Sequence, residues 1–333
     1  MSEPVMAVAS PATAGTRVPW GYALALIGVV LFAVNGTVAK GILLTGIGPL
    51  QLSALRITGA AVLLMIAAAV MTPGDLRIRL QELPLLAGYG IAGVALTQVL
   101  YFIAITRMPI AVALVIEFSA PVMVALWVRI VQHQPVRRLV WLALALAMVG
   151  LTLVTDLWQG PTLDPVGVLA AAGAAVSLAL YFIGGEHYVR QRSPVATAAW
   201  AMTAGAVAMA FLTPPWTVPW QQLSQPIGSD ALPWLAGPLW LSVGWVIVLG
   251  TFLPFLVTFT ALRYLPARQA VVIAMLEPVV AATVAYLVLG EVITALQILG
   301  GLLVLTGVVL ADLARLAPAP RGMRPHQPAD GVP

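Results

Sequence analysis

Residues 48–71 read GPLQLSALRITGAAVLLMIAAAVM, a continuous apolar run in which Arg56 is the single charged residue. A bilayer core about 30 Å thick is crossed by roughly 20 apolar residues in a helix. This stretch is therefore long enough to span a membrane. Comparable runs predict ten spans in all, at residues 20–40, 49–71, 83–105, 109–131, 139–155, 164–183, 195–213, 240–262, 266–289 and 294–314.

The composition of the whole chain agrees with a membrane protein. Of its 333 residues 61% are hydrophobic and 8% are charged, and the mean hydropathy is +1.00. A soluble domain carries about 25% charged residues, so lipid must be the main solvent of this chain. The sequence contains no Cys, which excludes disulfides, thiolate metal sites and cysteine nucleophiles. The predicted fold class is an all-α membrane protein.

The distribution of basic residues predicts the orientation. With the N-terminus in the cytoplasm, every Lys and Arg lies on a cytoplasmic segment except Lys40 and Arg107 outside and Arg56 within a span. The positive-inside rule therefore predicts a multi-pass protein of the bacterial inner membrane with both termini cytoplasmic. The ends, 1–19 and 315–333, are predicted cytoplasmic tails, the second one disordered. This distribution also explains the net charge of +4 without a nucleic-acid partner.

The longest predicted loop, residues 214–239, is rich in Pro and contains Trp216, Trp220 and Trp234. Trp is enriched at membrane–water interfaces. The loop is therefore predicted to rest on the outer surface of the membrane.

The chain is predicted to contain two copies of one unit. A shift of 157 residues places Pro121 on Pro278 and Gly150 on Gly307. Residues 20–156 and 164–314 are the predicted five-helix repeats, and an odd number of spans makes the second copy inverted. Inverted repeats are typical of alternating-access transporters, whose substrate site lies at the repeat interface near the midplane. The same shift aligns identical residues at 109 and 266, 113 and 270, 115 and 272, 116 and 273, 122 and 279, and 125 and 282.

Glu117 is the first candidate for the site. It lies roughly 12 Å inside the fourth span at 1.5 Å per residue, where a charged group costs at least about 2.5–3.5 kcal/mol. Pro121 cannot donate to the carbonyl of Glu117, four residues earlier. A carboxylate and a freed carbonyl on one turn can hold an ammonium group or a proton. The alternative is a protonated Glu117 bonded to a neighbouring helix.

Glu277 precedes Pro278 in the ninth span and belongs to the other half of the chain, as a shared central site requires. A structural bond between helices is the competing interpretation. Arg56 is predicted to be structural, either snorkelling outward or pairing with a carboxylate, and a contact with substrate is the less favoured alternative. Pro121, Pro278 and Glu291 are likewise predicted to be structural.

Further candidates are polar or amphipathic side chains in the middle of spans. Gln98 and Tyr101 are three residues apart and share one helix face. Gly88, Gly90 and Gly93 spell GxGxxG, but no strand precedes them, and close helix packing explains them better than a dinucleotide. For each polar candidate a helix-packing contact is the alternative. The candidates for contact with substrate are Glu117, Glu277, Asn35, Gln98, Tyr101, Ser119, Tyr181 and Trp245.

Several stretches resemble a known family. MLEPVVAATVAYLVLGEVITALQILG, residues 275–300, followed by GLLVLTGVVLAD is similar to the last two helices of the drug/metabolite transporter superfamily, EamA type. The run with Arg56 resembles that family's second helix, and IAVALVIEFSAPVMVALW, residues 110–127, resembles the fourth span of its threonine/homoserine exporter branch. The Glu277–Pro278 and Gly290–Glu291 pairs carry much of the likeness, although the first half has Gln134 where the second has Glu291. The resemblance implies a ten-helix fold with a central cavity and secondary, proton-linked export.

The predicted function is secondary active export of a small polar metabolite such as an amino acid, by alternating access coupled to a proton gradient. The expected partners are the substrate, protons and the lipid bilayer. An intramembrane enzyme acting on lipid and a non-transporting receptor are the alternatives. An enzyme would need a recognisable nucleophile or metal set, and the sequence has no HExxH, GxSxG, Walker or CxxC motif. No cofactor or metal is expected.

Overall fold

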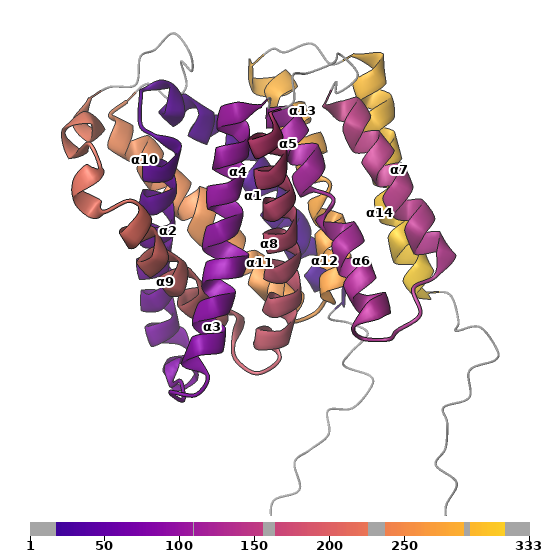
Figure 1. Ribbon diagram of the computed structural model, residues 1–333, viewed down its shortest axis with the longest axis horizontal. Helices are drawn as coiled ribbons and strands as arrows, with labels where there is room; N and C mark the ends of the chain where they lie inside the picture. The colour runs from indigo at the N-terminus through magenta and orange to yellow at the C-terminus, as the bar shows by residue number, and fades with distance from the viewer. Residues whose placement is uncertain (1–17, 109, 156–163, 226–236, 290–293, 317–333) are drawn as a thin grey trace, which may run out of the picture.

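A computed structural model describes residues 18–108, 110–155, 164–225, 237–289 and 294–316. Every element assigned within these residues is a helix, and nine helices in them are long and apolar enough to cross a membrane. The prediction of an all-α membrane protein is confirmed. Figure 1 shows these helices side by side, with the start of α1 (Val18–Leu44) and the end of α14 (Ala295–Leu316) on the same side of the bundle.

Five spans are single α-helices, and four are assembled from shorter segments. The single helices are α1, α2 (Pro49–Met71), α8 (Pro165–Val189), α9 (Pro194–Leu212) and α14. The composite spans are α3 (Leu83–Tyr89), η3 (Gly90–Ala95) and α4 (Leu96–Arg107); α5 (Ile110–Glu117) and α6 (Ala120–Ile130); α10 (Leu239–Ile247), η8 (Val248–Phe252) and α11 (Leu253–Leu262); and α12 (Ala267–Ala274) and α13 (Glu277–Leu289).

The remaining predicted span, residues 139–155, corresponds to the shorter helix α7 (Arg138–Val154), which has 17 residues. At 1.5 Å per residue it is roughly 25 Å long, slightly less than the bilayer core. It packs along α14. The count of ten membrane crossings stays a prediction that depends on α7.

The two spans that carry the aligned prolines are broken. Residues 118–119 separate α5 from α6, and residues 275–276 separate α12 from α13. The Ser119 amide donates to the Ile116 carbonyl at 3.1 Å, and the Met275 amide donates to the Val272 carbonyl at 3.1 Å. Both bonds reach back three residues, which tightens the turn before the proline. Because proline cannot donate and its ring collides with the preceding turn, the predicted continuous spans 109–131 and 266–289 are each two half-helices.

The packing of the helices follows a pattern in which the two halves exchange roles. α2 packs on α9 and α7 packs on α14, while α4, α5 and α6 of the first half pack on α8, and their counterparts α11, α12 and α13 of the second half pack on α1. In Figure 1, α2, α9 and α10 stand at one edge, and α7 and α14 stand at the other. An inverted repeat requires such exchanged pairs. The inversion itself stays a prediction, which superposing spans 1–5 on spans 6–10 tests.

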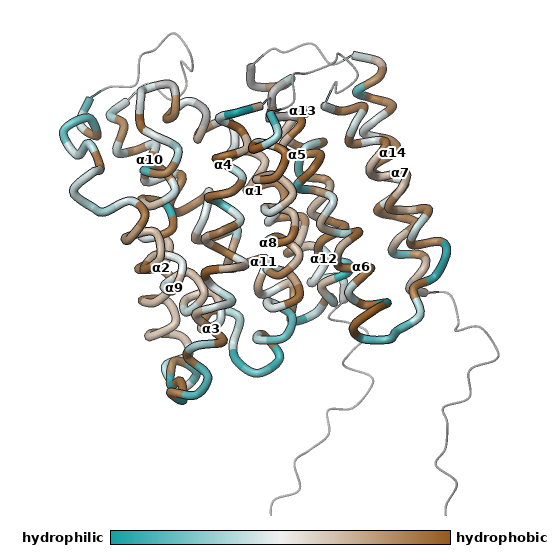
Figure 2. Tube along the Cα trace, viewed as in Figure 1, coloured by the Kyte–Doolittle hydropathy of each residue, from teal (hydrophilic) through white to brown (hydrophobic). Residues whose placement is uncertain are grey.

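The outer faces of the helices are apolar. Val70 and Phe211 are 78% and 83% exposed. Exposure of large apolar side chains is unfavourable in water and favourable in lipid. Hydrophilic residues gather at the two ends of the bundle, and hydrophobic ones dominate along the helices (Figure 2). The bundle therefore has an apolar belt of the kind that a multi-pass membrane protein needs.

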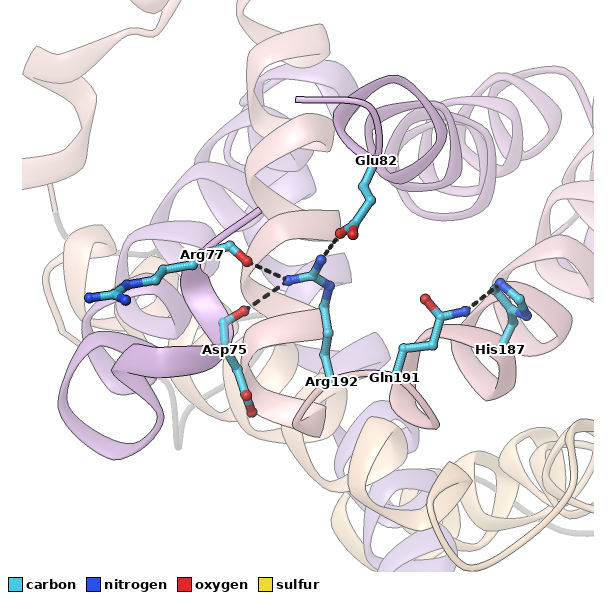
Figure 3. Close-up of polar contacts among 6 residues, drawn as sticks. All are labelled: Asp75, Arg77, Glu82, His187, Gln191 and Arg192. Carbon is cyan, nitrogen blue, oxygen red and sulfur yellow. Dashed lines mark hydrogen bonds and ion pairs between the residues drawn. The ribbon is translucent and has the colours of Figure 1, made fainter. Parts of the chain in front are cut away.

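A polar cluster ties together two connections at the end predicted to be cytoplasmic. Arg192 donates to the backbone carbonyls of Asp75 at 3.1 Å and Arg77 at 3.0 Å, and it forms an ion pair with Glu82. Figure 3 shows the guanidinium lying between these three residues. The connection from α2 to α3, which includes η2 (Pro73–Leu76), is thereby joined to the turn between α8 and α9.

The Trp-rich loop contains two short 3₁₀ helices, η5 (Pro215–Thr217) and η6 (Trp220–Ser224). Trp216 and Trp220 are exposed, while Trp234 lies outside the described residues. Gln51 Nε2 donates to the Thr217 carbonyl at 2.6 Å, which fixes the loop to the start of α2. Its placement on the outer side of the membrane stays a prediction.

Candidate functional site

A cavity of about 580 Å³ lies between helices of the two halves. This volume is within the roughly 300–1,000 Å³ typical of small-molecule sites. Its wall is mostly apolar, with few charged or polar side chains. Of the residues singled out in the sequence, those that line the cavity are Asn35, Arg56, Gln98, Tyr101, Glu117, Tyr181, Glu277 and Pro278.

The two carboxylates lie at the helix breaks. Glu117 is the last residue of α5 and is 8% exposed, and Glu277 is the first residue of α13. The two are close enough to interact electrostatically. Neither has a hydrogen bond or ion pair to another residue that the structure describes. Two acids from opposite halves of the chain therefore line one cavity, and neither receives a hydrogen bond from a residue in the described ranges.

The helix breaks place the two acids at opposite ends of helix dipoles. Glu277 is in the first turn of α13, where the helix dipole is favourable for a negative charge. Glu117 closes α5, where the dipole is unfavourable, and Pro121 leaves its carbonyl without the usual helical donor. The two carboxylates are thus not equivalent, although both line the same cavity.

Arg56 lies inside the protein, so the predicted outward snorkelling is not observed. It is 6% exposed on α2 and lines the cavity. Its Nε donates to Thr251 Oγ1 at 3.1 Å, and its Nη2 donates to the Gly250 carbonyl at 3.4 Å. It also interacts electrostatically with Glu277. The guanidinium is therefore held by the η8 turn beside an acid of the cavity.

Four uncharged candidates complete the predicted group. Gln98 and Tyr101 of α4 both line the cavity, as residues three apart on one helix face can. The Tyr181 ring packs edge-on against Phe255, with the ring centroids 5.5 Å apart. Asn35 is buried where its side chain meets Gly250, and a Cβ at Gly250 would collide with it. A glycine is thus required at this point of η8.

The remaining predicted residues lie elsewhere. Trp245 is 41% exposed on α10 and Ser119 is partly buried, and neither lines the cavity. Pro121 is buried and acts through the helix break. Glu291 lies outside the described residues. The structure therefore does not bring Ser119 or Trp245 to the group of acids.

Sequence reasoning missed Gly250 and Thr251, which hold Arg56. Both belong to a π-helical turn. A glycine and a threonine within an apolar span give no sequence signal for such a turn. Among the described residues, no group of His, Asp and Glu could hold a metal ion.

Comparisons with known proteins agree with this architecture. The sequence model of the EamA-like transporter family matches residues 19–156 and again residues 165–311. The threonine/homoserine exporter RhtA of Salmonella typhimurium (strain SL1344) is 30% identical over 261 residues, covering 76% of this chain and 78% of the exporter. RhtA of Escherichia coli (strain K12) is 29% identical over 255 residues with the same coverage.

Two further comparisons extend the coverage. The uncharacterized transporter YwfM of Bacillus subtilis (strain 168) is 27% identical over 293 residues, covering 87% of this chain and 92% of YwfM. A solved crystal structure that is 18% identical matches 89% of this chain and 98% of its own, with a TM-score of 0.72. At that identity the crystal structure shows a shared fold.

A multi-pass helical bundle with a central cavity, related in sequence to exporters and transporters, is a membrane transporter. The chain belongs to the EamA-like transporter family. The resemblance read from its spans is thereby confirmed.

Proposed function

We propose that this protein is a secondary active exporter of a small polar metabolite, an amino acid, driven by a proton gradient across the bacterial inner membrane. Both chain termini lie in the cytoplasm in this proposal. The RhtA relatives, named as threonine/homoserine exporters, support the substrate class. Named exporters and transporters among the relatives also favour transport over an intramembrane enzyme or a receptor.

The pair of carboxylates at the helix breaks carries the proposal. A charged group in a membrane protein is costly unless it is paired or hydrated. Glu117 and Glu277 come from opposite halves, line one cavity and have no hydrogen-bond donor among the described residues. A site so arranged is completed by a proton, an ammonium group or water. Broken helices in matching positions of two repeats are the usual location of the substrate site in secondary transporters.

Glu117 is the proposed proton carrier. It lies at the unfavourable end of a helix dipole, near a second carboxylate. Binding a proton there removes one of two neighbouring negative charges. In the proposed cycle, Glu117 exchanges a proton with the side to which the cavity is open. Glu277, in the first turn of α13, remains to attract the substrate ammonium group.

The experiment compares two activities of purified protein in proteoliposomes. Wild type should show counterflow of radiolabelled threonine and should move threonine when a proton gradient is imposed. Glu117→Gln keeps the size and hydrogen bonding of the side chain but cannot titrate. This variant should insert and fold, lose gradient-driven transport and retain exchange of threonine for threonine.

Asp164→Asn is the matched control. Asp164 caps α8 by accepting from the Gly167 amide at 2.7 Å, outside the cavity, and Asn is an equally good capping residue. Both activities should therefore survive this substitution. Full gradient-driven transport by Glu117→Gln would make Glu117 a structural residue and Glu277 the next candidate. Absence of counterflow with every amino acid tested would refute the substrate class.

A further inference from the structure

Among the described residues that line the cavity, Arg56 is the one basic side chain, and only two of its N–H donors are hydrogen-bonded to described residues. An Arg side chain presents five N–H donors in a rigid planar fork. One donor, on Nε, bonds to Thr251 Oγ1, and one on Nη2 bonds to the Gly250 carbonyl. Within the described part of the chain, Nη1 has no hydrogen bond. Nη1 and the second Nη2 hydrogen therefore form an unused edge.

The η8 turn fixes this guanidinium in place. Thr251 Oγ1 donates its own hydrogen to the Val246 carbonyl at 2.8 Å, so its lone pairs are directed to accept from Nε of Arg56. The Gly250 carbonyl belongs to the same turn and receives the second bond. The Arg56 side chain thus extends from α2 in the first half and is hydrogen-bonded to η8 in the second half. A group fixed in this way does not lose side-chain freedom when it binds a ligand, which favours affinity.

We propose that Arg56, held by Thr251 and Gly250, is the subsite for the carboxylate of the substrate, and that the cavity takes a zwitterion. The inference rests on the proposed function and makes its substrate class more specific. An Arg fork matches a carboxylate in geometry and binds it with charge-assisted hydrogen bonds. The acids at the helix breaks then receive the ammonium group at the other end of the substrate.

The charges of the cavity fit this assignment. With the coupling proton on Glu117, the charges left on the lining residues that the structure describes are the Arg56 guanidinium and the Glu277 carboxylate, which interact electrostatically. A bound zwitterion offers one carboxylate and one ammonium group and adds no net charge. The alternative is that Arg56 only neutralises Glu277, in which case the charge on the ligand carboxylate would not matter.

The test measures binding of radiolabelled threonine to the purified full-length protein, in competition with unlabelled threonine or threoninamide. The amide keeps the amine and the hydroxyl but has no negative charge. Threoninamide cannot form the charge-assisted hydrogen bond to Arg56. For wild type, the concentration of threoninamide needed to displace half of the radiolabelled threonine should therefore be at least about tenfold higher than that of threonine. In Arg56→Met the two competitors should become equal. Arg268→Met, which changes an exposed arginine outside the cavity, should keep the wild-type preference.

Thr251 gives a second test if Arg56→Met fails to fold. Thr251→Val leaves Arg56 present but removes the hydroxyl that holds it, so the preference for threonine over threoninamide should fall. Thr251→Ser keeps the hydroxyl and should restore the preference. A merely structural threonine would alter stability without altering the ratio of the two competitors.

The outcomes separate the two proposals. If wild type exports threonine but binds threoninamide equally well, the carboxylate subsite is refuted and the proposed function stands. An Arg56→Met protein that still prefers threonine refutes the subsite as well. If wild type neither binds nor moves any amino acid, the proposed function fails, and the subsite fails with it.

Discussion

Close backbone contact between α7 and α14 predicts how much stability the protein loses when Gly150 is replaced by Ala. A Cβ on Gly150 would lie 2.5 Å from the Gly300 carbonyl oxygen and 2.7 Å from the Val304 amide nitrogen. Ordinary contacts of a Cβ begin near 3.4 Å, so α14 would have to move away by about 0.9 Å. Both obstacles are backbone atoms, which cannot rotate aside. Overpacking of this kind costs about 1–3 kcal/mol, and Gly150→Ala should lose stability in that range.

The aligned position in the second half predicts a matching effect. A Cβ on Gly307 would lie 2.6 Å from the Ala143 carbonyl oxygen, so Gly307→Ala should cost about as much as Gly150→Ala. Both substitutions push the same two helices apart. In the double variant the second change should therefore cost less than it does alone, since substitutions coupled through a common backbone shift are not additive.

Unfolding of the purified protein in mixed micelles, followed by helical circular dichroism as a denaturing detergent is added, measures these effects. Gly88→Ala is the matched control, because a Cβ at Gly88 has no neighbour within 4 Å. This change should be neutral or stabilising by up to about 1 kcal/mol through helix propensity. If Gly150→Ala proves as stable as Gly88→Ala, the close approach of α7 and α14 is not a determinant of stability, and the reasoning fails.

Two other predictions concern the ends of the bundle. Arg192→Ala should lower the free energy of unfolding by about 1–3 kcal/mol, because it leaves two backbone carbonyls without their donor. Arg190→Ala, which removes an exposed ion pair within one helix, should cost no more than about 0.5 kcal/mol; equal losses in the same micelle assay would contradict this ranking. A single Cys at Gln222, in a chain that has no Cys of its own, should react with an impermeant thiol reagent from the periplasm, and one at Gln191 only from the cytoplasm. Reversed labelling would overturn the predicted orientation.

The helix breaks were only half predicted. Sequence reasoning identified Pro121 and Pro278 as equivalent and inferred a freed carbonyl at Glu117. It did not predict that each span would divide into two half-helices, because a proline can also kink a helix that continues. Backbone hydrogen bonds that reach back three residues before each proline end the first half-helix. Their formation depends on how neighbouring helices pack around the break.

Tyr101 and Trp245 show why the site could be only partly predicted. Both are aromatic residues in the middle of apolar spans, and the sequence treats them alike. Tyr101 lines the cavity, whereas Trp245 is 41% exposed on the outer side of α10. The rotation of each helix about its axis decides between these positions. In a span that is apolar on all sides, periodicity does not reveal that rotation.

The sequence by itself determined the membrane class, the approximate span positions and the resemblance to the family. About 20 apolar residues per crossing and the short motifs within the spans can be read along the chain without knowing how it packs. The tertiary structure alone decided that Arg56 turns inward to Thr251, which lies 195 residues away. Lipid and the protein interior are both apolar, so composition cannot tell which face of a helix meets the cavity. Only the packing of all the helices places Arg56, Glu117 and Glu277 around one space.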